Sequence, residues 1–240
     1  MQRGILFLLM VVASGAMATV DPGYRTITKA ERVAIVVVEL ATHAPKDRRF
    51  FYEFVEAAAH AETKNRIKPL YGKVILLSGV EATLKSLQQA VETAAAATTV
   101  KAVDLFLHLH GSPGGLSLRD GHYSTAKLGD TLRATKGLSE KLRALNSTAC
   151  WGSTHLKDFL AAGFKVASGS RKVNANGAHD TPTFLNLWGK GATYFEAQEK
   201  GNDPRWIKFY DNIAASWGMG AVDSYKEIEG NSDLTISDAP

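Results

Sequence analysis

Cys150 is the only cysteine in this chain of 240 residues, and its surroundings point to chemistry. It closes the segment LNSTAC and is followed by Trp and Gly. Forty residues earlier, the apolar run 103–110 ends in His110, which is followed by Gly111. A thiolate attacks a carbonyl carbon, and an imidazole protonates the departing amine and later activates water. This pair of residue types therefore predicts cleavage of an amide bond by Cys150 and His110.

Backbone N–H groups beside this pair would complete such a site. The oxyanion that forms during attack needs hydrogen-bond donors that already point at it. Gly111 has no Cβ, so a substrate can approach its N–H closely. The N–H of Cys150 is the natural second donor, and a helix starting near Thr154 would place a favourable dipole close to the thiol. We therefore expect an oxyanion hole formed by Gly111 and Cys150.

The elements that must position these residues alternate between strand and helix. Continuous apolar and β-branched runs predict strands at 33–40, 73–79, 102–110 and 164–168, with a further short strand ending at Cys150. Apolar residues at helical spacing predict helices at 46–63, 83–98, 139–144, 154–162, 183–200 and 205–216. A Gly/Pro-rich loop is expected at 111–115, and a hairpin or surface loop at 121–136. Because functional groups gather beyond the carboxyl ends of parallel strands, we expect His110 and Cys150 to meet at one sheet edge.

No internal repeat or linker divides this alternation of elements. It predicts one α/β domain over residues 19–230, with a mostly parallel sheet and helices on both faces. The last ten residues, 231–240, are mostly polar, and we expect them to form a frayed tail. The helix expected at 46–63 carries an apolar stripe on one face, made of Phe50, Phe51, Phe54, Val55 and Ala58.

The first eighteen residues have the features of a secretory signal peptide. Arg3 supplies a positive start, 5–13 is an apolar run too short to span a bilayer, and 16–18 has the small-x-small pattern of a cleavage site. We expect 1–18 to be removed and the protein to be secreted or periplasmic, with an uncleaved anchor as the alternative. No later stretch is apolar enough to span a membrane, so no membrane contact is expected after removal.

Charge and cysteine count exclude some classes of partner and pairing. The formal net charge is +4 without a concentrated basic run, which does not favour nucleic-acid binding. A secreted protein can form disulfides, yet Cys150 has no second cysteine to pair with. An unpaired thiol in an oxidising compartment is a liability unless it is buried or used in chemistry.

Two short motifs carry a resemblance to a known family. His110-Gly111 follows an apolar strand, and Ala149-Cys150-x-Gly152 stands at the end of the next one. Together they resemble the caspase-like cysteine peptidases, the group of caspases, metacaspases, legumain, gingipains and clostripain. The strand–helix order over residues 30–200 is also similar. The resemblance implies a caspase-like three-layer sandwich, with Cys150 as nucleophile, His110 as general acid and base, and a peptide or protein as substrate.

Specificity does not follow from this resemblance. Thr148 stands where caspases have glutamine and where Arg-specific relatives often have an acidic residue. Neither aspartate nor basic specificity is therefore carried over. Thr148, Ser168 and Arg171 are candidates for substrate contact, because they lie near predicted strand ends on the active edge. A solvated position is the alternative for Arg171.

Two further residues could support the catalytic histidine. His108 and Asp104 lie on the same side of the predicted strand as His110. His108 is an alternative to His110 as the catalytic base, or it supports His110 from behind. A buried aspartate needs a partner, so Asp104 is expected to orient a histidine or to bind backbone N–H groups.

Two other functions are compatible with the sequence. A catalytically silent α/β protein would bury the thiol of Cys150 and use its pocket to bind a peptide or a small ligand. A zinc-dependent hydrolase would use His108, His110 and Cys150 as ligands. We favour the absence of a metal, and no cofactor is expected.

Overall fold

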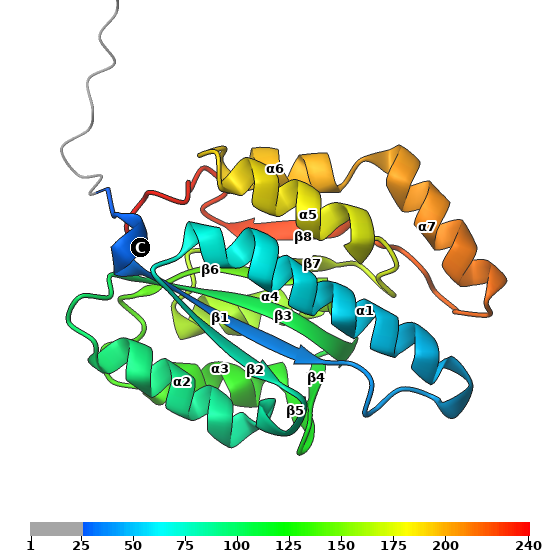
Figure 1. Ribbon diagram of the computed structural model, residues 1–240, viewed down its shortest axis with the longest axis horizontal. Helices are drawn as coiled ribbons and strands as arrows, with labels where there is room; N and C mark the ends of the chain where they lie inside the picture. Colours follow the sequence, from blue (N-terminus) through cyan, green and yellow to red (C-terminus); the bar gives the residue numbers. More distant parts are fainter. Residues whose placement is uncertain (1–25) are drawn as a thin grey trace, which may run out of the picture.

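The computed structural model describes residues 26–240 and shows a three-layer α/β sandwich (Figure 1). The sheet has the order β2-β1-β3-β6-β7-β8, and the β4–β5 hairpin continues from β3. The strands are β1 Arg32–Glu39, β2 Lys73–Ser78, β3 Ala102–Ser112, β4 Gly115–Leu118, β5 Gly121–Ser124, β6 Leu142–Ser147, β7 Val166–Ser170 and β8 Lys226–Gly230. The first three, β6 and β7 pair in parallel, whereas β8 is antiparallel to β7. The predicted α/β class with a mostly parallel sheet is confirmed.

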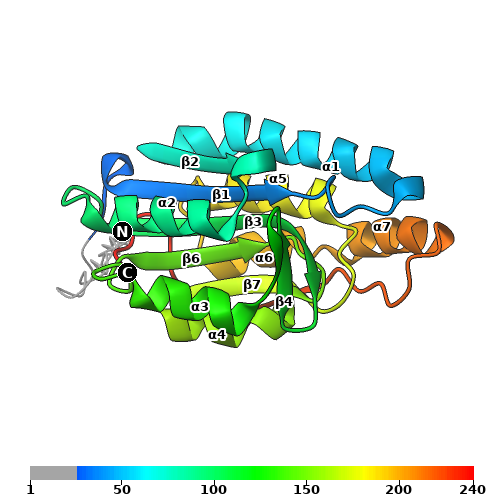
Figure 2. The same ribbon diagram turned by 90° about the horizontal axis from the view of Figure 1, so that it is seen from below.

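Helices cover both faces of this sheet, as the alternation of elements predicts. Figures 1 and 2 show α1, α5 and α6 on one face and α2 and α3 on the other. The helices are α1 Arg49–Glu62, α2 Leu84–Ala96, α3 Thr125–Ala134, α4 Leu156–Ala162, α5 Gly177–Trp188, α6 Tyr194–Gly201 and α7 Pro204–Ser216. Short 3₁₀ or π turns flank several of them, including Gly152–His155 directly before α4.

The sequence of β1 explains why both faces must be covered. All eight of its residues are buried. Val33, Ile35 and Val37 join a hydrophobic core with residues of α2, α3 and α4, and the even-numbered residues between them join a second core with residues of α1, α5 and α6. Because side chains alternate along a strand, a run that is apolar at every position requires helices on both sides.

Several predicted element boundaries are wrong. The chain is not helical at 139–144, because β6 begins at Leu142 and buries that side chain in the sheet core. The helix predicted at 183–200 is two helices, α5 and α6, separated by a turn in which Gly191 has φ +87°. The region 111–136 is more regular than expected: β3 runs on into the β4–β5 hairpin, and α3 follows. Side-chain oxygens of Ser124 and Thr83 cap α3 and α2.

The apolar stripe of α1 is only partly buried. Phe50 is 84% exposed and Phe54 is 66% exposed, so these two rings do not belong to the core. Figure 1 shows why: the start of α1 extends beyond the arrowheads of β1 and β3, where no sheet lies beneath it. Ala58, the last member of the stripe, is exposed as well, and α1 reaches the core through the next residue, Ala59.

The last ten residues are not a frayed tail. Leu234 and Ile236 are buried in the core beneath α5 and α6. The carbonyl oxygen of Ile236 accepts hydrogen bonds from Arg32, at 2.8 Å, and from the buried guanidinium of Arg143. These contacts hold the polar-looking segment 231–240 against the amino ends of the strands.

The predicted signal peptide, 1–18, lies outside the described residues. From residue 26 onward, none of the helices combines the length and the hydrophobicity that crossing a bilayer requires.

Candidate active site

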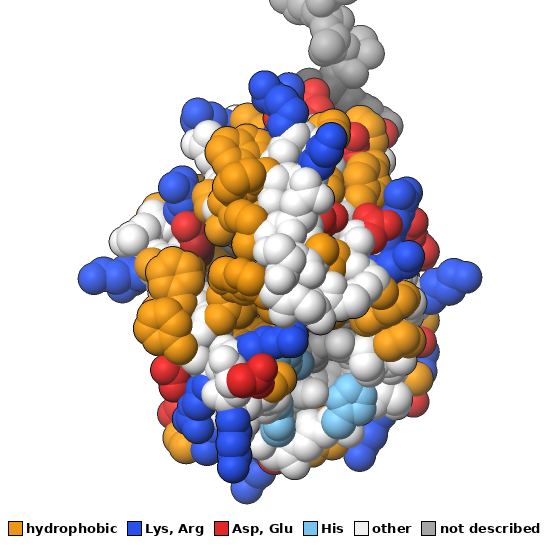
Figure 3. Space-filling view, turned by 90° about the vertical axis from the view of Figure 1, so that its right-hand side faces the viewer, with side chains coloured by type: hydrophobic (Ala, Val, Ile, Leu, Met, Phe, Trp, Pro, Cys, Tyr) orange, Lys and Arg blue, Asp and Glu red, His pale blue; other side chains and the backbone are white. Residues whose placement is uncertain are grey.

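The predicted strand ends meet at one edge of the sheet. β1, β3, β6 and β7 run in parallel, so their carboxyl ends share the edge on the right of Figure 1. Figure 3 views this edge directly and shows histidine side chains in its lower part, with hydrophobic side chains gathered beside and above them. His110 lies near the end of β3, and Cys150 lies in the turn after β6.

Gly111 and Cys150 pack directly against each other. A Cβ added at Gly111 would collide with the carbonyl oxygen of Cys150 and would lie 3.0 Å from the Cβ of Ala149. The close approach of these backbones therefore requires glycine at position 111. The structure brings the His110-Gly111 and Ala149-Cys150 motifs together, as the sequence predicts.

One ring nitrogen of His110 is engaged by a backbone carbonyl. Its Nε2 lies 2.7 Å from the carbonyl oxygen of Leu40, which directly follows β1. A carbonyl can only accept, so Nε2 carries the hydrogen. Nδ1 of the neutral ring is then the nitrogen with a free lone pair. A fixed Nε2–H tautomer is what a histidine needs in order to accept a proton through Nδ1.

Tyr52 of α1 covers the imidazole of His110. Its ring packs on the imidazole of His110 with centroids 4.5 Å apart and planes tilted by 60°. Burial, with a further contribution from the nearby Cys150, raises the pKa of Tyr52. Tyr52 therefore stays a neutral phenol. Nothing in the local sequence indicates that α1 turns this ring toward β3, so Tyr52 could not be predicted as part of the site.

Burial keeps both members of the pair uncharged at rest. It raises the pKa of the Cys150 thiol, although the N–H groups of Asn174 and of Cys150 itself partly offset the effect. It also lowers the pKa of His110, against an opposing contribution from the hydrogen bond to Leu40. A neutral thiol and a neutral imidazole are therefore the resting state, and any proton transfer between them has to accompany attack on a substrate.

The turn that carries Cys150 is tight and strained. Trp151 has φ 58° and ψ 23°, the left-handed region that residues with a Cβ rarely adopt, and its N–H donates to the carbonyl of Lys172 at 2.8 Å. A Cβ at Gly152 would lie 2.7 Å from the Cα of Gly169 in β7, so this position also requires glycine. Non-glycine strain of this kind clusters at functional sites.

The predicted oxyanion hole stays a prediction. The N–H of Cys150 is directed at its own sulfur, and Gly111 pairs with Leu116 of β4 in the hairpin register. α4 begins at Leu156 rather than near Thr154, after a short 3₁₀ turn. Thr154 instead accepts a hydrogen bond from the N–H of Gly114 at 2.9 Å, and this bond ties the hairpin to the cysteine turn.

His108 and Thr148 contact each other beside the strand end that carries His110. The Oγ1 of Thr148 lies 3.2 Å from Nδ1 of His108 and 3.2 Å from the carbonyl oxygen of Leu107. Burial, followed by the nearby Lys226 ammonium, lowers the pKa of His108 to about 3. His108 is therefore a buried neutral residue, which fits support rather than proton transfer. The hydroxyl of Thr148 is committed to these bonds, which leaves it unsuited to contact a substrate.

Asp104 does not orient a histidine. It forms a buried ion pair with Arg143, with Oδ1 2.9 Å from Nε, and it accepts hydrogen bonds from the hydroxyl of Tyr71 at 2.6 Å and from the N–H of Ala144 at 3.1 Å. It lies six residues before His110, toward the amino end of β3, and of the two expected alternatives it follows the second, binding a backbone N–H group.

Ser168 and Arg171, the other two candidates for substrate contact, are both engaged by protein groups. Ser168 is fully buried, and its hydroxyl bonds to Tyr194 at 2.7 Å and to Gln198 at 3.0 Å. Arg171 is exposed, pairs with Glu227 at 2.9 Å and stacks over the ring of Tyr225. Side chains point to alternate faces of a strand, and the one at position 168 points into the core.

A buried ionic network lies beneath β6 and β7, and local sequence patterns did not indicate it. Lys226 is 1% exposed, forms an ion pair with Asp180 and donates to Oδ1 of Asn146 at 2.9 Å. Gln198 bonds to Asp180 at 2.6 Å and to Asn146 at 3.1 Å. The members come from separate elements, so only the fold brings them together.

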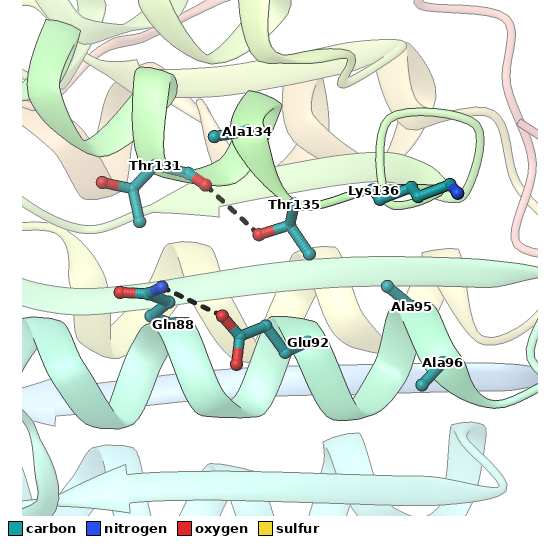
Figure 4. Close-up of a pocket in the computed structure, with 8 residues that line it drawn as sticks. All are labelled: Gln88, Glu92, Ala95, Ala96, Thr131, Ala134, Thr135 and Lys136. Atoms are coloured by element: carbon teal, nitrogen blue, oxygen red, sulfur yellow. Dashed lines mark hydrogen bonds between the residues drawn. The ribbon is translucent and has the colours of Figure 1, made fainter.

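A pocket elsewhere on the surface lacks catalytic groups. It lies between α2 and α3 (Figure 4) and is lined by Gln88, Glu92, Ala95, Ala96, Thr131, Ala134, Thr135 and Lys136. Its hydrogen bonds, from Gln88 to Glu92 and from Thr135 to the carbonyl of Thr131, are contacts within single helices. None of its lining residues carries a thiol or an imidazole.

The set of His108, His110 and Cys150 does not form a metal centre. Among residues 26–240, no group of three or more histidine, cysteine, aspartate or glutamate side chains is arranged to hold a metal ion. The nitrogen atoms Nδ1 of His108 and Nε2 of His110 are engaged by Thr148 and Leu40.

Comparison with known proteins gives no relative from which a function could be inferred, so the functional assignment rests on the site. No protein-family model matches the chain. No curated protein matches it with significance.

Proposed function

We propose that this protein is a cysteine peptidase in which Cys150 is the nucleophile and His110 the general acid and base. The observation that carries the proposal is the direct packing of Gly111 on Cys150, with Nε2 of His110 held by the Leu40 carbonyl. The packing brings the backbones of the two motifs together, and we propose that the thiol of Cys150 faces Nδ1 of His110, the nitrogen that can accept a proton. The resemblance of the two motifs to caspase-like peptidases supports the same assignment.

The reaction balances through these two side chains. Sγ of Cys150 forms a bond to the substrate carbonyl carbon while His110 takes the thiol proton. His110 then gives this proton to the amide nitrogen, the C–N bond breaks and the amine leaves. Water attacks the thioester with His110 as base, the S–C bond breaks, and the proton returns to the thiol. The N–H groups of Gly111 and Cys150 are the proposed donors to each oxyanion.

The neutral resting state has a mechanistic consequence. Because burial raises the pKa of the thiol and lowers that of His110, the ion pair forms only when a bound substrate favours it. Cys150 is thereby protected from oxidation in a secretory compartment, where thiolates react fastest. Secretion through removal of 1–18, with action on extracellular or periplasmic peptides, is part of this proposal.

Peptide turnover by single variants tests the assignment. The chain lacking residues 1–18 is incubated with a peptide library, alongside Cys150→Ala, His110→Ala and His60→Ala. His60 lies on α1 and serves as a matched histidine control. The proposal predicts cleavage by the parent and by His60→Ala, with a loss of about 1,000-fold or more in the other two variants. Equal turnover by all four proteins would contradict it.

The raised pKa of the thiol also favours a second candidate, a catalytically silent binding protein with a buried Cys150. Alkylation with iodoacetamide separates the two. A peptidase thiol with a raised pKa should label in the native state at a rate that still climbs above pH ~8.5, the ordinary thiol pKa. A silent protein would label only after denaturation.

A further inference from the structure

We infer that Glu56 is a positioning residue for His110, acting through the backbone of Leu40 and Ala41. The inference rests on the proposed function for its catalytic consequence, but its structural part stands on contacts within the chain. Glu56 lies on α1, and one of its carboxylate oxygens, Oε2, accepts from the N–H of Leu40 at 3.0 Å and from the N–H of Ala41 at 2.9 Å.

These two N–H groups are the first that follow the end of β1 at Glu39. Here the chain leaves the sheet, so ladder bonds no longer define its path. Buried N–H groups without a partner are costly, and hydrogen bonds to a carboxylate are stronger than neutral ones. Glu56 therefore fixes the direction in which the chain leaves β1.

The same residue, Leu40, holds the histidine. Its N–H is bound by Glu56, and its carbonyl oxygen accepts from Nε2 of His110 at 2.7 Å. The carbonyl of Leu40 shares its peptide plane with the N–H of Ala41, which Glu56 also binds, at 2.9 Å. Because that plane is rigid, holding the N–H restricts rotation of the carbonyl. The chain of contacts runs from a helix carboxylate, through one backbone residue, to the imidazole.

Two side chains on one face of α1 help to position His110. Tyr52 and Glu56 are four residues apart, so they lie on the same side of the helix, one turn after the other. Tyr52 packs on the ring of His110, and Glu56 fixes the residue to which that ring donates. Placing α1 therefore sets both the plane and the tautomer of His110.

Loss of the Glu56 carboxylate would allow His110 to change its tautomer. Without Glu56, the Leu40 carbonyl can turn away, and the Nδ1–H form of His110 becomes populated. That form cannot accept the thiol proton through Nδ1. Burial and the nearby His43 lower the pKa of His110, whereas the hydrogen bond to Leu40 and the nearby Glu39 raise it. Loss of the hydrogen bond to Leu40 therefore moves the pKa of His110 lower.

NMR of the ¹⁵N-labelled histidine ring measures the tautomer directly, in the whole mature chain and without substrate. The variants are Glu56→Ala, Glu56→Gln, Glu56→Asp and the control Glu53→Ala. Glu53 lies on the same helix, is exposed and pairs with Arg49 at 3.0 Å. Glutamine keeps an acceptor oxygen at the right reach, whereas aspartate keeps the charge but is one methylene shorter.

We expect the Nε2–H tautomer in the parent, in Glu56→Gln and in Glu53→Ala, and a tautomer mixture in Glu56→Ala and Glu56→Asp. In the latter two, kcat should fall by about 10- to 100-fold with little change in KM, and the acid limb of the pH profile should move to lower pH. Circular dichroism confirms folding, and Glu56→Asp replaces Glu56→Ala if the alanine variant does not fold.

The two proposals fail separately. If the parent cleaves no peptide but Glu56→Ala changes the His110 tautomer, the peptidase assignment fails and the positioning role stands. If the parent cleaves peptide and Glu56→Ala or Glu56→Asp leaves the tautomer and the pH profile unchanged, the positioning role is overturned and the peptidase assignment stands.

Discussion

At the scale of single residues, Gly111 decides whether the two motifs can meet. A side chain at this position would strike the backbone of Cys150, which lies at a turn that cannot yield freely. We predict that Gly111→Ala loses peptide turnover and lowers the free energy of unfolding by roughly 1–3 kcal/mol. Urea unfolding and a cleavage assay measure the two effects. Gly220→Ala is the control, because an added Cβ there meets nothing within 4 Å and its φ is not positive. Similar behaviour of both variants would show that the packing at Gly111 is tolerant.

Tyr52 affects the pKa of His110 by burying its ring. Its ring covers the imidazole, and burial is the largest cause of the lowered pKa of His110. Tyr52→Ala should therefore raise the pKa of His110 toward its ordinary value and move the acid limb of the rate profile to higher pH. Tyr52→Phe keeps the ring and should leave that limb in place. An NMR titration of His110 checks the direction, and an unchanged value in Tyr52→Ala would contradict the role given to the ring.

At the scale of elements, α7 is held more loosely than its neighbours. Ala214 is its one buried residue, and Trp217 directly after it packs edge-on against Phe51 of α1, with centroids 5.2 Å apart. We predict that Trp217→Ala speeds amide hydrogen exchange across 204–216 while leaving the sheet amides protected. Phe209→Ala is the control, because that ring is equally exposed and packs on Trp206 and Tyr210 of its own helix. Uniform protection in Trp217→Ala would show that other contacts hold the helix.

Elements also show how far sequence reasoning reaches. The strands β1 and β3 were predictable because each is apolar at almost every position, and parallel pairing then brings their carboxyl ends together. That argument placed His110 and Cys150 at one edge. The structure adds that the backbone after β1 lies beside His110, since Glu39 pairs with Leu109. The roles of Tyr52 and Glu56 were not predictable, because they depend on which face α1 turns toward that backbone.

The errors have a common physical cause. β6 was predicted partly as helix because its local composition is ambiguous, and its strand state depends on tertiary contacts such as the ion pair between Arg143 and Asp104. The segment 231–240 looks polar by composition, yet Leu234 and Ile236 reach the core. Phe50 and Phe54 stay exposed because the start of α1 extends beyond the ends of the strands. In each case a distant part of the chain decides the outcome.

At the scale of the whole molecule, buried histidines link stability to pH. His108 has a folded pKa of about 3, below its ordinary value, so the unfolded chain binds a proton that the folded chain rejects. This contribution to stability is complete above pH ~6.5 and is lost as the pH falls toward 3, by up to about 5 kcal/mol. Urea unfolding at several pH values measures the slope. His108→Gln, which cannot titrate, should flatten it between pH 6.5 and 4. Parallel slopes in the two proteins would contradict a buried neutral His108.

Trapping the acyl-enzyme tests whether Cys150 attacks a peptide carbonyl with His110 as its base. The mature chain is mixed with a peptide found to be cleaved in the library, quenched in acid during turnover, and weighed intact by mass spectrometry before peptide mapping. We expect a mass increase equal to the acyl half of the substrate, located on Cys150, absent in Cys150→Ala and strongly reduced in His110→Ala. Cleavage without any adduct on Cys150, persisting in Cys150→Ala, would contradict it.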